Sequence, residues 1–66
     1  MPLLQLIVGR LNASESGQVP REEIRREMHG HFSRKRAERH IDTAIDWGRY
    51  AELFDYDADA QHFVRL

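Results

Sequence analysis

The sequence predicts a mainly α-helical domain of the α+β class, in which three helices precede a small C-terminal β-hairpin. Apolar residues recur at helical spacing in three segments, and aromatic and β-branched residues are enriched in residues 53–66. With 66 residues and no cysteine, the chain forms one domain, residues 1–66, that folds by packing alone. A three-helix bundle with an unstructured tail is the alternative, which the composition of the tail disfavours.

The first helix is predicted over residues 2–12. Pro2 suits the first helical turn, because the N–H group that proline lacks would have no partner there. One buried face, with i, i+3, i+4 and i+7 spacing, is formed by Leu4, Ile7, Val8 and Leu11. Leu3 and Leu6 lie off this face, so a homodimer formed through this helix is one expectation.

A second, short helix is predicted to begin at Pro20 and to end before Gly30. Residues 13–18 are polar and form the connecting turn, and Val19 is expected to make a short strand contact. Gly30 suits the left-handed conformation that ends helices, and Ser33 is a suitable N-cap for the next one. Two helices joined by such a turn match the helix-turn-helix pattern.

The third helix is predicted over residues 33–48, and the hairpin follows it. The buried stripe of this helix consists of Ala37, Ile41, Ala44, Ile45 and Gly48. The hairpin has its turn at residues 57–61, with a strand register that the sequence leaves open. Three helices followed by a two-stranded wing describe a winged-helix-like domain.

Basic and acidic residues are segregated along the chain: residues 1–39 carry eight basic and five acidic side chains, and residues 40–66 carry two and six. A basic cluster opens the third predicted helix, and it consists of Arg34, Lys35, Arg36 and Arg39. In helix-turn-helix proteins this helix enters the major groove, so DNA binding through residues 33–48 is one hypothesis. Asp55, Asp57 and Asp59 in the hairpin would repel phosphates, which favours a solvated or protein-docking face instead.

The sequence lacks the patterns that catalysis, cofactors or metals require. It contains no GxxxxGK[ST] phosphate-binding loop, and nothing in it positions a nucleophile beside a base. The chain has four histidines, His29, His31, His40 and His62. Their spacing is not that of structural zinc sites. We therefore expect no enzymatic activity, no cofactor and no metal, with the histidines exposed.

Aromatic residues gather where the third helix meets the hairpin. Trp47 lies at the edge of the buried stripe, where one interpretation makes it a core residue or an anchor for the hairpin. In the other interpretation Trp47, Tyr50 and Phe54 form a semi-exposed patch of the composition that protein interfaces favour. Partner docking is therefore assigned to these three aromatic residues.

Direct membrane insertion is not expected. The longest apolar stretch, residues 3–8, is interrupted by Gln5 and is far shorter than the roughly 20 residues that span a bilayer. The absence of cysteine fits a reducing compartment, so the predicted location is cytoplasmic.

Residues 41–57, with the sequence IDTAIDWGRYAELFDYD, are unusual in their order. This segment resembles the C-terminal AAA-associated domain of bacterial and archaeal ABC transporter ATP-binding subunits, of the nitrate, sulfonate and taurine import type. The upstream Phe32-Ser33 and residues 37–39 extend the resemblance. Departures from the family pattern are basic residues after Ser33, where acidic ones are usual, and Ala60-Gln61 in the wing turn, where glycine is usual.

The resemblance implies a non-catalytic accessory domain that follows a complete ATPase core. Such a domain would dock onto the ATPase core of the same or a sister subunit, or onto a cytosolic regulator, and would be membrane-associated through the transporter complex. Docking would shift the equilibrium between open and closed ATPase dimers, with the basic cluster selecting the partner by charge. The alternative is a small DNA-binding transcriptional regulator that uses residues 33–48 for recognition.

Overall fold

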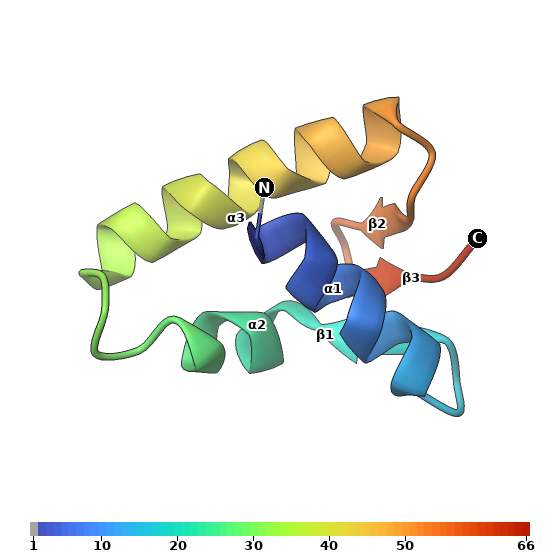
Figure 1. Ribbon diagram of the computed structural model, residues 1–66, viewed down its shortest axis with the longest axis horizontal. Coiled ribbons are helices and arrows are strands. Elements are labelled where there is room, and N and C mark those ends of the chain that lie inside the picture. The colour runs from blue at the N-terminus through green and yellow to red at the C-terminus, as the bar shows by residue number, and fades with distance from the viewer. Residues whose placement is uncertain (1) are drawn as a thin grey trace.

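A computed structural model describes residues 2–66 as three helices and a small three-stranded sheet (Figure 1). In chain order the elements are α1 (Pro2–Ala13), β1 (Gln18–Pro20), α2 (Arg21–Glu27), α3 (Arg34–Tyr50), β2 (Asp55–Asp57) and β3 (His62–Val64). The predicted mainly helical α+β class is confirmed, and the helix positions agree with the hydrophobic spacing.

The predicted helix boundaries have the expected local causes. The Ser33 side chain accepts a hydrogen bond from the backbone N–H of Arg36 at 3.3 Å, so it caps the N-terminus of α3. Gly30, in the turn between α2 and α3, has a φ of 89°, a left-handed conformation that glycine adopts without strain. The turn therefore allows α3 to pack against α2.

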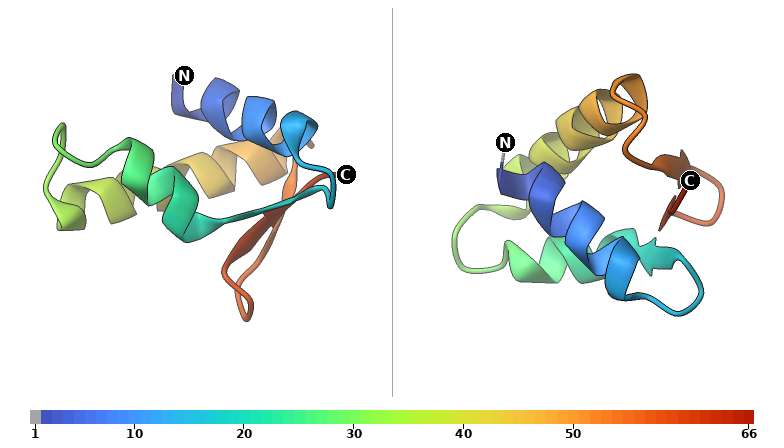
Figure 2. Two further views of the ribbon diagram at one scale, coloured as in Figure 1. Left: turned by 90° about the horizontal axis from the view of Figure 1, so that it is seen from below. Right: turned by 45° about the vertical axis from the view of Figure 1, so that its right-hand side comes forward.

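The sheet has the order β1-β3-β2, with both pairs antiparallel. Val19 and Tyr56 both lie opposite Phe63, so β3 is the central strand. The expected two-stranded wing is thus corrected to a three-stranded sheet, since β1 adds to the hairpin. Two three-residue strands alone are marginal in water, and the third strand and the helices stabilise them. Figure 2 shows the β2–β3 loop projecting away from the helices.

The hairpin turn forms without glycine. Gln61 adopts a left-handed φ of 55°, which costs free energy in a residue with a Cβ atom. The Asp57 carboxylate accepts hydrogen bonds from the backbone N–H groups of Asp59 and Ala60, at 3.0 Å and 3.1 Å. These bonds hold the turn in the way that Asx turns do.

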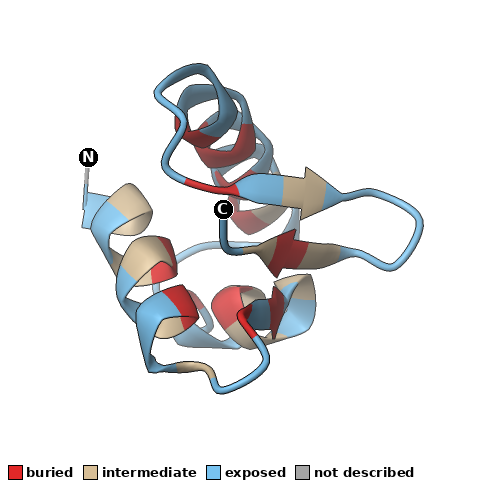
Figure 3. Ribbon diagram, turned by 90° about the vertical axis from the view of Figure 1, so that its right-hand side faces the viewer, coloured by how far each residue is buried: buried red, intermediate tan, exposed pale blue. Residues whose placement is uncertain are grey.

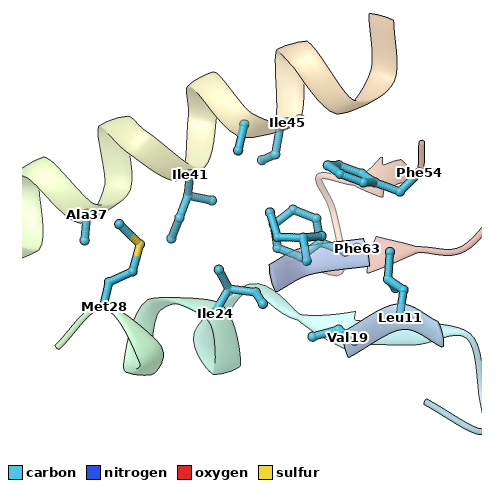
Figure 4. Close-up of a cluster of buried hydrophobic side chains, with 11 residues drawn as sticks. Leu11, Val19, Ile24, Met28, Ala37, Ile41, Ile45, Phe54 and Phe63 are labelled. Carbon is cyan, nitrogen blue, oxygen red and sulfur yellow. The ribbon is translucent and has the colours of Figure 1, made fainter. Parts of the chain in front are cut away.

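The hydrophobic core lies between the three helices and the sheet, as the buried residues in Figure 3 and the side chains in Figure 4 show. It consists of Ile7, Leu11, Val19, Ile24, Met28, Ala37, Ile41, Ala44, Ile45, Phe54 and Phe63. Phe54 and Phe63 pack edge to face, with ring centroids 5.5 Å apart. The two rings join the C-terminal half of α3 to the sheet.

A tight contact fixes the path from α3 into β2. A Cβ atom on Gly48 would lie 2.1 Å from Cζ of Phe54, so the Phe54 ring occupies the space that any larger residue would need. The helix ends in a Schellman motif, in which Leu53 N–H donates to the Gly48 carbonyl at 2.8 Å and Glu52 N–H to the Arg49 carbonyl at 3.2 Å. Glu52 takes the left-handed position of this motif, with a φ of 58°.

Arg21 joins α2 to α3 and to the hairpin. Its guanidinium group donates to Glu38 at 2.9 Å, to Asp42 at 2.8 Å and to the Tyr56 hydroxyl at 3.3 Å. Partial burial by itself would lower the pKa of Arg21, but hydrogen bonds to Tyr56, Asp42 and Glu38 raise it above its usual value. Arg21 therefore stays charged and fixes these elements relative to one another.

Candidate docking surface

Two of the three aromatic residues predicted to dock lie on the surface. Trp47 is 57% exposed and Tyr50 is 85% exposed, and their rings meet edge to face with centroids 6.5 Å apart. Phe54 is only 1% exposed, because its ring packs over Gly48. The expected patch of three rings is therefore corrected to a pair on the surface, and Trp47 is not a core residue.

The exposed pair belongs to the outer face of α3, which points away from the rest of the molecule. Figure 1 shows α3 along one edge, with the other helices and the sheet on its inner side. We define the outer face as seven exposed residues, Arg36, Arg39, His40, Thr43, Asp46, Trp47 and Tyr50. Helical periodicity places them opposite the buried stripe of the same helix.

A shallow depression lies in the first half of this outer face. Its volume is about 280 Å³, and it is lined by Arg36, Arg39, His40 and Thr43. These residues have i, i+3, i+4 and i+7 spacing, so they surround one spot on the helix surface. The depression is open to solvent and is large enough to accept a side chain from another molecule.

The side chains of the basic cluster are exposed. Within residues 2–66, none of its four residues forms an ion pair, whereas the other arginines of α1, α2 and the end of α3 do. Arg10, for example, pairs with Glu23 at 3.2 Å, and Arg49 pairs with Asp55 at 3.4 Å. The positive charge at the start of α3 is thus available to an external anion or carboxylate.

The opposite end of α3 and the hairpin carry negative charge. Five carboxylates in this region are exposed, and they are Asp46, Glu52, Asp55, Asp57 and Asp59. On the outer face of α3, the cations Arg36 and Arg39 lie in the first half of the helix and the carboxylate Asp46 lies in the second half, so the sign of the charge changes along this face. This polarity follows the segregation of charge in the sequence.

A separate apolar groove lies beside α1. Its volume is about 450 Å³, and it is lined by Pro2, Leu3, Leu6, Met28, Phe32 and His40. Leu3 and Leu6, which the sequence places off the main face, are half-buried against the core. Phe32 packs on His40, with ring centroids 4.8 Å apart.

Among residues 2–66, no group of three or more histidine, cysteine or acidic side chains is arranged to hold a metal ion. His29, His31 and His40 are exposed, and His62 is half-buried in β3, with its Nδ1 3.4 Å from the Gln18 side-chain oxygen. No helix in the described part of the chain is long and apolar enough to cross a membrane.

The comparisons with known proteins agree with the sequence pattern. The family model described as the C-terminal AAA-associated domain matches residues 1–57, which include all three helices and β2. The chain belongs to this family. No curated protein and no solved structure matched significantly.

Sequence reasoning identified the basic cluster, Trp47 and Tyr50 but missed the middle of the outer face. Thr43 and Asp46 carry no recognisable motif, and His40 was considered only as a metal ligand. A signal was present, because residues 36, 40, 43, 47 and 50 have alternating spacings of four and three. Residues 36, 40, 43, 47 and 50 form a second stripe on α3, which can be recognised after the buried stripe has been assigned to the core.

Proposed function

We propose that this AAA-associated domain is a non-catalytic docking module of an ABC-type ATP-binding subunit, of the kind that serves nitrate, sulfonate or taurine uptake. The observation that carries the proposal is that the family match spans α3, where an exposed aromatic pair shares one face with Arg36 and Arg39, two cations of the basic cluster that form no ion pair within residues 2–66. Aromatic residues and arginine are enriched at protein interfaces.

The proposed mechanism is mechanical. Docking of the outer face onto the ATPase core, onto a sister copy or onto a cytosolic regulator changes the balance between open and closed ATPase dimers. Such a change requires that the docked domain bind one of the two states more tightly. Trp47 and Tyr50 supply apolar contact area, and the basic cluster supplies selection by charge.

We also propose that the fold is a winged helix. The element order α1-β1-α2-α3-β2-β3, with β1 paired to β3, supports this assignment. The glycine-containing turn between α2 and α3 supports it too. In this arrangement α3 is the helix that such domains present to their partners, protein or nucleic acid.

The test of docking is ATP turnover by the ATP-binding subunit together with this domain. The double variant Trp47→Ala/Tyr50→Ala removes exposed side chains only, so the fold is expected to survive. We expect turnover to change about fivefold or more, which is the lower end of usual coupling free energies. Glu15→Gln, an exposed change away from α3, is the matched control. Unchanged turnover and unchanged subunit dimerisation in the double variant would refute the proposal.

DNA binding is the second candidate, and the unpaired basic cluster on α3 favours it. It predicts affinity for duplex DNA that falls steeply with salt, because each phosphate contact releases counterions. Alanine at the four cluster positions should then abolish binding and flatten the salt dependence. Binding that does not depend on salt would exclude this candidate, and exposed Asp55, Asp57 and Asp59 in the hairpin oppose it.

A further inference from the structure

The outer face of α3 is complementary to itself under a two-fold rotation. Its cations, Arg36 and Arg39, lie in the first half of the helix, and its carboxylate, Asp46, lies in the second half with the two aromatic rings. Thr43 lies between the two halves. When a second α3 runs in the opposite direction, the cationic half of each helix faces the acidic and aromatic half of the other.

The spacing of this face is that of a helix-packing seam. Residues 36, 40, 43, 47 and 50 alternate steps of four and three, as the seam positions of coiled coils do. In such packing, each seam side chain inserts into a hole between four residues of the facing helix. The depression bounded by Arg36, Arg39, His40 and Thr43 has the four-residue outline of such a hole. Trp47 and Tyr50 are the large exposed aromatic side chains of the seam.

We propose that two copies of this chain associate through the outer faces of α3, antiparallel and with the two-fold axis beside Thr43. The two-fold rotation brings each residue of one copy opposite the residue of the other copy that lies the same number of positions away from Thr43, on its other side. Trp47 of one copy then enters the depression of the other, and Tyr50 lies opposite Arg36. Guanidinium groups close to aromatic faces add cation–π attraction to the contact.

Charge selects this orientation over the parallel one. Arg39 and Asp46 lie on the same flank of the seam, seven residues apart in the sequence. In the antiparallel pair, Arg39 faces Asp46 of the second copy, and the symmetry makes this contact twice. In a parallel pair, this flank of one copy lies on the opposite side of the seam from the same flank of the other copy. Arg39 then meets no Asp46, and the ion pair is lost.

The contact is small, so the dimer is expected to be transient. A buried aromatic side chain removes about 150–250 Å² from water, and the four rings of two copies supply most of the area. The total stays near or below the roughly 1,200 Å² at which stable interfaces begin. Two copies held in one assembly would meet at an effective concentration in the millimolar range, which is enough for a weak contact.

This inference rests on the proposed docking role of Trp47 and Tyr50, and it names a second copy of this chain as the partner. The apolar groove beside α1 is the competing surface for a dimer. Nothing on that groove is complementary in charge to another part of the molecule, whereas the outer face of α3 is. The groove therefore serves as an alternative outcome of the test.

The test is sedimentation equilibrium of the chain from about 10 μM to about 1 mM, where contacts of this size dissociate. The mass of the wild type should rise from 7.8 kDa toward twice that value. Trp47→Ala should weaken association tenfold or more, on the order of the effect of an aromatic hot spot. Arg39→Asp should weaken it about fivefold, and Arg39→Asp/Asp46→Arg should restore it, because the exchange recreates both ion pairs.

Matched controls separate the possible results. Glu15→Lys changes an exposed charge outside the face and should leave the mass profile unchanged. A constant 7.8 kDa at the highest concentration would overturn the proposal. The proposal would also be overturned if Arg39→Asp/Asp46→Arg associated no more strongly than Arg39→Asp. A third contrary result would be a dimer that is lost with Leu6→Glu but kept with Trp47→Ala. Circular dichroism verifies that each variant is folded.

The same variants distinguish the self-association from the docking function. If the chain stays monomeric while Trp47→Ala still changes ATP turnover, self-association is refuted and docking stands. If the chain dimerises as proposed while Trp47→Ala leaves the rate of ATP turnover unchanged, the docking function is refuted and the dimer stands.

Discussion

Gly48→Ala should destabilise this domain although alanine is the better helix former. The new Cβ would lie 2.1, 2.4 and 2.7 Å from three carbons of the Phe54 ring, which is itself 1% exposed. The ring cannot retreat freely, because Phe63 packs against it with centroids 5.5 Å apart. Overpacking of this kind costs about 1–3 kcal/mol, and expelling the ring would cost about 3–5 kcal/mol.

The helix propensity of alanine offsets only about 1 kcal/mol of that cost. The net loss is therefore up to about 2 kcal/mol if the ring shifts and about 2–4 kcal/mol if it is expelled. The thermal midpoint should fall by about 4–8 °C for each kcal/mol. Gly9→Ala is the matched control, since no atom lies within 4 Å of its added Cβ. It should raise the midpoint by a few degrees, because helix propensity contributes about 1 kcal/mol. Circular dichroism melting measures both, and a Gly48→Ala midpoint equal to or above wild type would refute the packing account.

Three further predictions concern the helix end, the Arg21 network and acid stability. Glu52→Gly should stabilise the domain in urea unfolding by about 0.5–1 kcal/mol by relieving the left-handed φ of 58°, whereas Glu15→Gly should not. Arg21→Met should cost about 1–3 kcal/mol in the same assay, because it leaves its partners without donors, and exposed Arg26→Met should cost almost nothing. The hydrogen bond from Arg25 lowers the pKa of Glu22, so this pair stabilises the fold above the ordinary carboxyl pKa of about 4.3. That contribution is lost as pH falls through the lowered pKa, and Glu22→Gln should make stability depend less on pH over this range.

Hydrophobic spacing predicted the helices because each buries one stripe with the period of the α-helix. Ala37, Ile41 and Ala44 are all buried where the pattern placed them, and Ser33 caps α3 as its side chain suggested. Local signals of this kind depend on residues close in sequence. They therefore needed no knowledge of the tertiary structure.

Features that depend on distant residues were harder to predict. The expectation that Phe54 is partly exposed was wrong. Its ring is buried because Gly48 has no side chain and because the Schellman motif between the two residues turns the chain back over the helix. Val19 was expected only to make a short contact, and its pairing with Phe63 reflects strand geometry across 44 positions of sequence. Arg21 was not singled out, since its partners lie on α3 and β2.

The central claim, that the outer face of α3 docks onto protein, is tested most directly by photo-crosslinking in the source cells. A photoreactive residue replaces Tyr50, and a second version carries it at Glu15 as the matched control, because both side chains are exposed. The account predicts adducts from position 50 with a second copy of this domain or with an ABC-type ATP-binding subunit, and few from position 15. Equal yields at both positions, or adducts from position 50 chiefly with nucleic acid, would contradict it.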